Sequence, residues 1–175
     1  MNDDQLVVRP LRGADDLAAI TALIHAAYAR HAAGGLRFWG THQTVADTTT
    51  RFASGAGLVA ERNGQLVGTL TVHGPQPDSP FACYRDAGTW GFTQFAVAPA
   101  QRGHGVGAAL HRQAIALARA GGAHRMTIDT AAPALGLIAL YERWGYTVCG
   151  ECDRRPLTNY LSTVMSRPLH PGADV

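Results

Sequence analysis

Residues 92–118 read FTQFAVAPAQRGHGVGAALHRQAIALA and combine features of a strand, a glycine-rich turn and a helix. Phe92, Phe95 and Val97 favour a strand, and Pro99 ends it because proline has no N–H to donate to a neighbouring strand. Apolar residues then recur at spacings of three and four, which is typical of one helix face. The first turn of such a helix has backbone N–H groups without intrahelical partners, and glycines let a ligand approach them closely. The segment therefore predicts a phosphate-binding site at the start of a helix.

The spacing of the glycines narrows the choice of phosphate ligand. A Walker loop ends in Gly-Lys-Ser/Thr, whereas Gly107 is followed by Ala108, with no lysine for a terminal phosphate and no hydroxyl for magnesium. This difference argues against ATP and GTP. A dinucleotide fingerprint has the spacing GxGxxG after the first strand of the fold, whereas the glycines here are spaced GxGxG halfway along the chain.

Turn signals divide the rest of the chain into alternating strands and helices. The clearest hairpin has Asn63-Gly64 between two strands of alternating polarity. Residues 74–88 contain three prolines and several turn formers, and they predict a long loop. The expected strands are residues 6–11, 57–62, 65–73, 89–98, 125–130, 146–151 and 159–167, and the expected helices are 15–33, 44–53, 105–120 and 135–144.

Three motifs, in this order and spacing, resemble one family. Arg102-x-x-Gly105-x-Gly107 resembles the coenzyme A pyrophosphate loop of the GNAT superfamily of N-acetyltransferases, LYERWGY at residues 140–146 is similar to its aromatic pair around Glu-x-x-Gly, and residues 158–169 resemble its terminal strand. The resemblance implies the α/β GNAT fold: a mixed, mostly antiparallel sheet of about seven strands, about four flanking helices, and a V-shaped splay between the fourth and fifth strands. We expect one such domain over residues 1–175.

The resemblance also implies that acetyl-CoA is the co-substrate and lies in this splay. Backbone groups freed in the cofactor strand would pair with the pantetheine amides, one amide would polarise the thioester carbonyl, and the loop amides would bind the pyrophosphate. Arg102 would add a charge-assisted contact, whereas the side chain of His104 is expected to face solvent. The predicted cofactor-binding residues are Phe95, Ala96, Val97, Arg102, Gly103, His104, Gly105, Val106, Gly107 and Ala108.

Tyr141 stands at the position of the family's general-acid tyrosine. When an amine attacks the thioester directly, coenzyme A leaves as a thiolate, and a nearby hydroxyl can protonate its sulfur. A purely structural aromatic on a helix face is the alternative. Ala134 departs from the family pattern, because many members place there an Asn that binds the pantetheine arm.

The general base is left open by the sequence. Many members carry a Glu as base or water anchor where this chain has Thr93 and Gln94, and neither residue is a base at neutral pH. His73, at the end of a hairpin strand, and Asp86, in the long loop, are the candidate bases, with a water chain to bulk solvent as the alternative.

Composition indicates an ordinary globular protein, with 46% hydrophobic and 16% charged residues in a chain of 175. No apolar run reaches the roughly eighteen residues of a membrane helix, and the first ten residues lack the features of a signal peptide. We therefore expect a cytoplasmic protein that does not associate with membranes. The net charge of +2 comes from scattered arginines, which does not imply a nucleic-acid partner.

Cys149 and Cys152 form a CxxC motif, a pattern found in zinc sites and in redox sites. A zinc site needs a second pair of Cys or His at compatible spacing, and a redox motif would start a helix after an early strand. In the strand expected here, positions three apart face opposite sides of the sheet. We expect no metal.

The acceptor is expected between residues 29–53 and the loop 74–88. The first segment has three arginines against one acid, which argues against a polycationic acceptor such as an aminoglycoside. The composition favours a small amine that carries an anionic or aromatic group, such as an amino acid derivative. The residues behind this expectation are Arg30, Arg37, Phe38, Trp39, Asp47 and Arg51.

Three functions are therefore compatible with the sequence. The first is a small-molecule N-acetyltransferase that uses direct attack by a primary amine. The second is a protein acetyltransferase that modifies an N-terminus or a lysine, and the third is a non-catalytic acyl-CoA-binding sensor of the same fold. The chain gives no direct sign of its oligomeric state, although homodimers are common for this fold.

Overall fold

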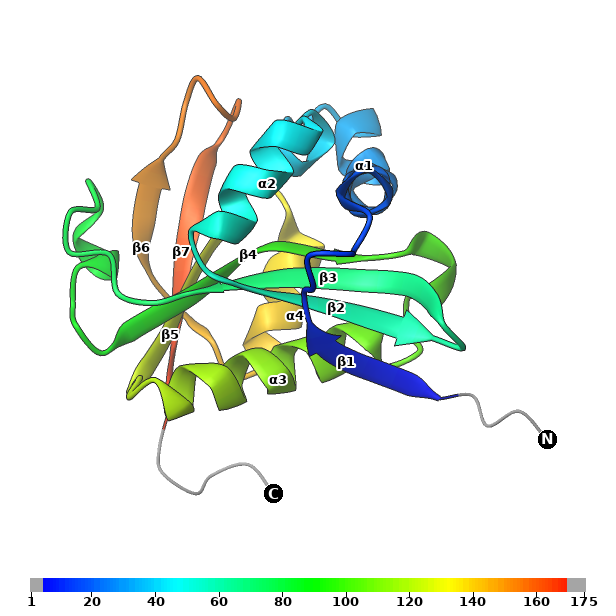
Figure 1. The fold of residues 1–175 in the computed structure, drawn as a ribbon. Coiled ribbons are helices and arrows are strands. Elements are labelled where there is room, and N and C mark those ends of the chain that lie inside the picture. The colour runs from blue at the N-terminus through cyan, green and yellow to red at the C-terminus, as the bar shows by residue number, and fades with distance from the viewer. Residues whose placement is uncertain (1–4, 170–175) are drawn as a thin grey trace.

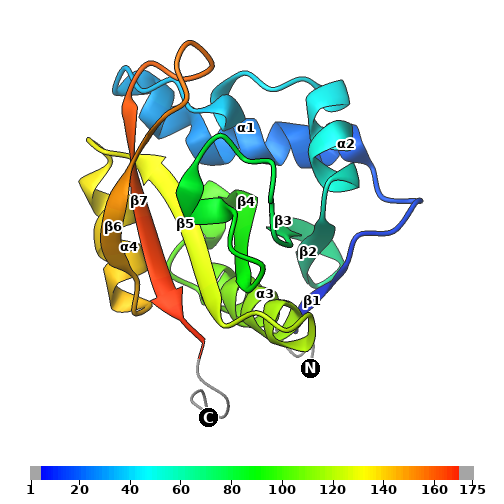
Figure 2. The same cartoon turned by 90° about the vertical axis from the view of Figure 1, so that its left-hand side faces the viewer.

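The computed structural model describes residues 5–169, and the remaining ends of the predicted domain lie outside the described residues. Within this range the chain forms one seven-stranded sheet with helices on both faces (Figures 1 and 2). The strands are β1 (Leu6–Pro10), β2 (Ala56–Arg62), β3 (Gln65–His73), β4 (Thr89–Val97), β5 (Arg125–Ala131), β6 (Thr147–Asp153) and β7 (Leu161–Pro168). The α-helices are α1 (Leu17–Ala33), α2 (Val45–Ala53), α3 (Val106–Ala120) and α4 (Leu135–Arg143), with 3-10 turns η1 (Trp39–Thr41), η2 (Ala82–Tyr84) and η3 (Pro99–Gln101).

The sheet is antiparallel except at its centre, with the strand order β1-β2-β3-β4-β5-β7-β6. Strands β4 and β5 are parallel, and they pair only at Thr89 with Arg125 and at Trp90 with Met126. Beyond these residues the strands separate: in Figure 1 both start at the lower left, from where β4 runs to the right and β5 runs upward. The predicted architecture is confirmed, including the V-shaped splay between the fourth and fifth strands.

The turn between β2 and β3 has the backbone that its sequence predicts. Asn63 and Gly64 have φ values of 52° and 77°, and Arg62 pairs with Gln65 across the turn. Positive φ at both central residues gives a turn whose twist matches that of the two strands. This hairpin fixes the register between β2 and β3, and His73, the last residue of β3, pairs with Gly91 of β4.

Helices α1 and α2 begin at side chains that accept hydrogen bonds from free backbone N–H groups. Asp16 caps α1, and Thr44 and Asp47 form a capping box at α2. Asp15 was expected in the first turn of α1, but it lies before the helix and pairs with Arg9 at 2.7 Å. Helix α3 differs from these, because Gly105 precedes it and no side chain caps it. No helix within residues 5–169 is long and apolar enough to cross a membrane.

Two apolar layers hold the helices on the sheet. Helices α1 and α2 cover one face, where Ile20, Ile24 and Phe52 are buried, and α3 and α4 cover the other, where Leu110 and Tyr141 are buried (Figure 1). Both layers continue past the point where β4 and β5 separate. The point where β4 and β5 separate therefore lies between the layer that contains α1 and the layer that contains α4.

Candidate active site

Two cavities meet where β4 and β5 separate. The first, here called the central cavity, has a volume of about 550 Å³ and is bounded by α1, α2, β3, β4, β5 and the loop after β6. The second, here called the loop cavity, has a volume of about 390 Å³ and is bounded by α1, β4, the glycine-rich turn and α4. Among the described residues, those that line both cavities are Tyr28, Phe95, Leu137 and Tyr141. A ligand in one cavity can therefore touch a ligand in the other at this junction.

The loop cavity ends at the first turn of α3. Gly103 and Gly105 have φ values of 78° and 82°, a conformation that only glycine adopts without strain, and a Cβ on either would meet nothing within 4 Å. A Cβ on Gly107 would lie 3.1 Å from the Phe95 ring. The first turn of α3 has no acidic side chain. Its N–H groups are thus available to an anion.

Most of the residues predicted from the glycine-rich segment line the loop cavity. These are Phe95, Ala96, Val97, Arg102, Gly103, Gly105, Gly107 and Ala108. Val106 and His104 do not. The side chain of Val106 is buried in the core below the turn, and the carbonyl of His104 accepts a hydrogen bond from Arg62 at the surface.

Arginines surround the loop cavity without any carboxylate among its described lining residues. The guanidinium of Arg102 donates to the carbonyl of Ala27 at 2.5 Å, so this side chain ties the turn to α1. Arg30 and Arg143 also line the cavity, from α1 and α4. The cavity is positively charged, which suits a ligand with several phosphates.

A bulge in β4 separates the two cavities. The pairing of β3 with β4 shifts by one residue between Thr71 and Thr69, and Gln94 has a φ value of 53°. The side chain of Gln94 is buried and donates to Thr71 at 3.0 Å. The next residue, Phe95, accepts a hydrogen bond on its carbonyl from the Tyr28 hydroxyl at 3.0 Å, so this carbonyl, which was predicted to be free, already has one partner.

Tyr141 lies at the junction. Its side chain is 6% exposed and packs against the rings of Phe92 and Trp144. Burial raises the pKa of Tyr141 well above its ordinary value. The hydroxyl therefore keeps its proton at neutral pH and is able to donate it to a group in either cavity.

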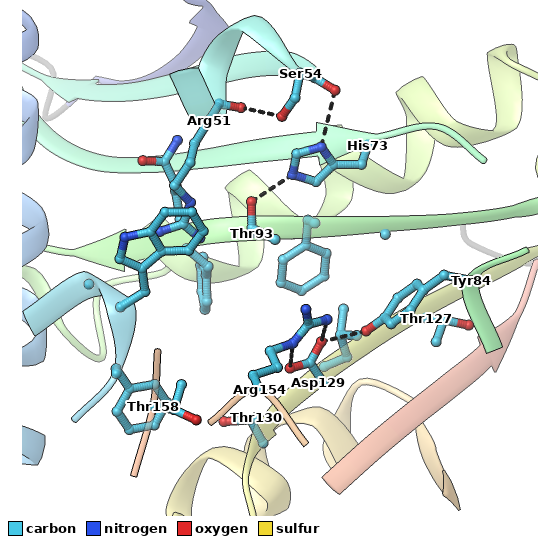
Figure 3. Close-up of a pocket in the computed structure, with 18 of the residues that line it drawn as sticks. Arg51, Ser54, His73, Tyr84, Thr93, Thr127, Asp129, Thr130, Arg154 and Thr158 are labelled. Atoms are coloured by element: carbon cyan, nitrogen blue, oxygen red, sulfur yellow. Dashed lines mark hydrogen bonds and ion pairs between the residues drawn. The ribbon is translucent and has the colours of Figure 1, made fainter. Parts of the chain in front are cut away.

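His73 lies at the wall of the central cavity, where it contacts Thr93 (Figure 3). Its Nδ1 faces the carbonyl of Ser54 at 3.3 Å, and its Nε2 lies 2.6 Å from the Thr93 hydroxyl. Because a carbonyl only accepts, Nδ1 carries the proton and Nε2 accepts from Thr93. Burial is the largest effect on the pKa of His73 and lowers it. The hydrogen bond with the Ser54 carbonyl raises this pKa by a smaller amount, and the charge of Arg51 lowers it slightly further. His73 is therefore a neutral base coupled to a hydroxyl in the cavity.

Asp86, the other candidate base, lines neither cavity. Its carboxylate accepts from the N–H of Gly88 at 2.8 Å and lies 3.2 Å from Nε2 of His124, with about half of the side chain exposed. These contacts shape the turn that leads into β4, at the end of the strand away from the junction. The structure thus does not bring Asp86 together with Tyr141 and His73.

Arg51 projects from the last turn of α2 into the central cavity. Its Cζ lies 4.3 Å from the centre of the Trp39 ring, and its Nη1 donates to Oε1 of Gln43 at 2.6 Å. Burial lowers the pKa of Arg51 to about 10. The side chain is therefore still charged at neutral pH, in partly desolvated surroundings.

The opposite wall holds a second charged cluster (Figure 3). Asp129 of β5 accepts two hydrogen bonds from Arg154, at 2.6 and 2.8 Å, and one from the Tyr84 hydroxyl at 2.6 Å. Burial acts to raise the pKa of Asp129, but Arg154 and Tyr84 lower it overall. The cluster joins β5 to η2 and to the loop after β6.

Sequence reasoning missed Tyr28, Asp129 and Arg154. Tyr28 lies on α1, where the apolar spacing of the helix already accounts for an aromatic residue. Asp129 and Arg154 come together only through the pairing of β5 and β6 with β7. Ala134, at the position of the family's Asn, is buried against Phe38 and Tyr160 and lines neither cavity. Within residues 5–169, no group of three or more His, Cys, Asp or Glu side chains is arranged to hold a metal ion.

Comparisons with known proteins identify the family and the fold of the chain. The family model of the acetyltransferase (GNAT) family matches residues 19–146, which is well over half of the chain. None of the curated proteins matches the sequence. Among solved structures, yncA from Salmonella typhimurium, determined with its cofactor acetyl-CoA, is 24% identical over 98% of each chain, with a TM-score of 0.69.

Two further solved structures have the same fold. A GNAT family acetyltransferase from Elizabethkingia anophelis with acetyl-CoA bound is 15% identical over 95% of this chain and 100% of that chain, with a TM-score of 0.67. The ribosomal-protein-S18-alanine N-acetyltransferase from Escherichia coli is 16% identical over 98% of this chain and 99% of that chain, with a TM-score of 0.71. With the match of the family model, these likenesses lead to one conclusion: the chain belongs to the GNAT family of acetyltransferases.

Proposed function

We propose that this protein transfers an acetyl group from acetyl-CoA to the primary amine of a small molecule by direct attack. The observation that carries the proposal is the junction of two cavities at Tyr141. One cavity is positively charged and ends at a helix start, and the other is large enough for a small acceptor. Catalysis of a two-substrate reaction requires such a meeting point, because the reacting atoms must be held within about 3–3.5 Å of each other.

The loop cavity fits acetyl-CoA. The N–H groups at the start of α3, exposed by Gly103 and Gly105, suit the pyrophosphate, and Arg30 and Arg143 suit the remaining negative charge. From Gly91 onward, the edge of β4 that faces β5 has no strand partner among the described residues, so its backbone is able to pair with the pantetheine amides. When bound, acetyl-CoA supplies a thioester whose carbonyl carbon an amine can attack. The acetyl-CoA in two solved structures of the same fold supports this assignment.

Tyr141 acts as the general acid. Its buried hydroxyl remains protonated at neutral pH, and it lies where both cavities meet. From this position it donates its proton to the departing thiolate sulfur. The Tyr28 hydroxyl is already used by the Phe95 carbonyl, which leaves Tyr141 as the better placed donor.

His73 acts as the base through Thr93. The Thr93 hydroxyl donates to Nε2 of His73 and keeps its oxygen lone pairs toward the cavity. An acceptor ammonium there gives a proton to the Thr93 oxygen while the Thr93 proton moves to His73, which leaves a neutral, nucleophilic amine. The lowered pKa of His73 keeps the ring neutral and ready to accept that proton at neutral pH.

The acceptor is a small molecule because the central cavity has walls on several sides. Its volume of about 550 Å³ falls within the range of small-molecule sites, about 300–1,000 Å³. Phe38 and Trp39 bound it from the α1–α2 connection, and Leu157 and Tyr160 bound it from the loop after β6. A folded protein surface would need an open groove here.

The proposal is tested by acetyl-CoA binding and by thiol release with amines. Calorimetry should detect binding of acetyl-CoA to the native protein in the micromolar range. Ala108→Glu places a carboxylate in the first turn of α3, which favours the helix but repels the phosphates, and it should abolish binding. Ala108→Gln has the same size without the charge and should retain more of the affinity.

Release of free thiol that depends on an added small amine completes the test. Binding without turnover on any amine would favour the acyl-CoA sensor, and turnover only on peptides or proteins would favour the protein acetyltransferase. Equal binding by the native protein and Ala108→Glu would remove the loop cavity as the cofactor site.

A further inference from the structure

We propose that Arg51 binds the carboxylate of the acceptor, so that the substrate is an α-amino acid with an apolar side chain. This inference rests on the proposed function, since it assumes that an acceptor amine occupies the central cavity. It adds the chemical class of that acceptor and the residue that selects it.

Arg51 is a cation whose two close contacts are with neutral groups. Within residues 5–169 no carboxylate lies within the 4.0 Å of an ion pair from its guanidinium, and its contacts are the neutral Trp39 ring and the Gln43 side-chain oxygen. Both contacts leave N–H donors of the five-donor guanidinium for a further acceptor. A carboxylate fits this fork with two parallel hydrogen bonds.

The position of Arg51 is fixed before any ligand binds. Gln43, which accepts from Arg51, is fully buried and donates to Thr48 at 2.7 Å and to Gln94 at 2.8 Å. Gln94 is the bulge residue of β4, one position after Thr93. A chain of hydrogen bonds thus ties the cation to the strand that carries the proposed catalytic hydroxyl.

Asp47 and Asp129 attract Arg51 only at a distance, since neither forms an ion pair with it within residues 5–169. Asp129 is the only carboxylate among its described lining residues, and that carboxylate is held by Arg154 and Tyr84. The lowered pKa of His73 keeps it neutral. The cavity therefore has an excess of one positive charge, which attracts a monoanionic group and repels a polycationic acceptor.

The arrangement of the walls matches the three groups of an amino acid. Arg51 and Thr93 line the same cavity, with Arg51 on α2 and Thr93 on strand β4 (Figure 3). A carboxylate at Arg51 directs the adjacent amine toward Thr93 and the junction with Tyr141. The side chain then contacts the apolar wall of Phe38, Leu157 and Tyr160.

The inference is tested first by binding, which needs no turnover. N-acetyl-L-leucine and N-acetyl-L-leucinamide differ only in the carboxylate, and calorimetry on the protein saturated with coenzyme A compares them. The acid should bind at least about tenfold more tightly than the amide, as expected for a charge-assisted pair. Arg51→Gln should remove this preference, and Arg51→Lys should restore part of it.

A matched control uses another arginine of the same region. Arg37 is exposed, donates to the carbonyl of Pro156 and does not line the central cavity, so Arg37→Gln should keep the full preference for the acid. Arg51→Met, which retains packing on Trp39, covers the case in which Arg51→Gln fails to fold. Equal binding of acid and amide by the native protein, or an unchanged preference in both Arg51→Gln and Arg51→Met, would overturn the inference.

Turnover of L-leucine and L-leucinamide separates this inference from the proposed function. Preference for the acid, lost in the Arg51 variants, supports both. Binding of N-acetyl-L-leucine that depends on Arg51, without thiol release from any amine, would support the carboxylate site and contradict the transferase. Efficient acetylation of L-leucinamide and other neutral amines, with no preference for L-leucine, would leave the transferase intact and overturn the role of Arg51.

Discussion

In the proposed reaction one side chain acts as the acid and another as the base. The sequence predicts Tyr141 from its motif, and it predicts His73 as one of two candidate bases. It does not predict the part played by Thr93, because a threonine hydroxyl alone is no base at neutral pH. The structure couples Thr93 to His73 at 2.6 Å, a contact between β3 and β4 that depends on their register. Such a pair is not visible in either strand's sequence alone.

Replacement of Tyr141 by Phe removes the proposed proton donor and keeps the ring that packs against Phe92. We expect kcat to fall about 100-fold, as for the loss of a general acid, with acetyl-CoA affinity changed less than about twofold. Steady-state kinetics and calorimetry measure the two quantities. An unchanged kcat on the preferred acceptor would exclude Tyr141 from the chemistry.

The assignment of His73 as the base predicts how kcat/KM depends on pH. The neutral form of His73 is active, and its pKa is lowered from the ordinary value of 6.5, so kcat/KM should be constant at neutral pH and should fall only below pH 6.5. Thr93→Val should lower kcat by about tenfold or more, because the relay hydroxyl is lost. It should also make the fall of kcat/KM in acid less pronounced. Thr93→Ser keeps the hydroxyl and should stay close to the native protein. If Thr93→Val and Thr93→Ser had the same profile, the relay would be refuted.

Among the elements, β4 and α3 position the site together. Their order, the hairpin before them and the glycine turn between them are all predicted by local sequence, because turn residues and apolar spacing act over a few positions. The bulge at Gln94 is not predicted. It is held by Gln43, 51 positions earlier, and by Thr71 on β3, so its cause lies in tertiary contacts.

The packing of α3 on β3 depends on Gly68. A Cβ on Gly68 would lie 2.9 Å from Leu110 and Val106 side-chain atoms of α3 and 3.1 Å from the Ala96 carbonyl. Gly68→Ala should therefore push α3 from the sheet and lower the free energy of unfolding by about 1–3 kcal/mol, as for an overpacked core. Acetyl-CoA affinity should fall as well, because the first turn of α3 moves.

Gly13 provides the control for this substitution. A Cβ there would meet nothing within 4 Å, so Gly13→Ala should change the free energy of unfolding by no more than about 0.5 kcal/mol. Urea denaturation of both variants gives the comparison. A Gly68→Ala protein as stable as Gly13→Ala would mean that α3 does not pack as described.

Across the complete fold, the splay of β4 and β5 creates the site and also removes hydrogen bonds from the centre of the sheet. The Asp129–Arg154–Tyr84 cluster connects the two halves of the molecule beside this gap. The family resemblance predicts the splay, but not this cluster, since its residues come from three distant segments. The three arginines of residues 29–53 predict an anionic group on the acceptor but do not say which arginine binds it. Only the three-dimensional structure shows that, among the described residues, Arg51 forms no ion pair.

Asp129→Asn should destabilise the protein, since it leaves Arg154 without its partly buried anion. The side chains are only 15% and 34% exposed, and we expect a loss of about 1–3 kcal/mol in the free energy of unfolding at pH 7. The folded-state pKa of Asp129 is lowered from 3.8, so this stabilisation is present above that pH and is lost as the pH falls through the lowered pKa. The difference between native and variant should therefore shrink in acid.

Asp153→Asn is the matched control for this change. Asp153 pairs with Arg155 at 2.7 Å, but the two side chains are 48% and 54% exposed. Solvent screens a pair as exposed as this one, so this variant should unfold nearly as the native protein does. Equal losses in the two variants would show that the cluster has no special part in holding the halves together.

A crystal structure with coenzyme A and N-acetyl-L-leucine tests the meeting of the two cavities most directly. We predict the pyrophosphate at the first turn of α3, the sulfur within about 3.5 Å of the Tyr141 hydroxyl, and the acetylated nitrogen beside Thr93. A sulfur that lies outside the junction would contradict acetyl transfer at this site. An N-acetyl group bound away from Tyr141 would contradict it as well.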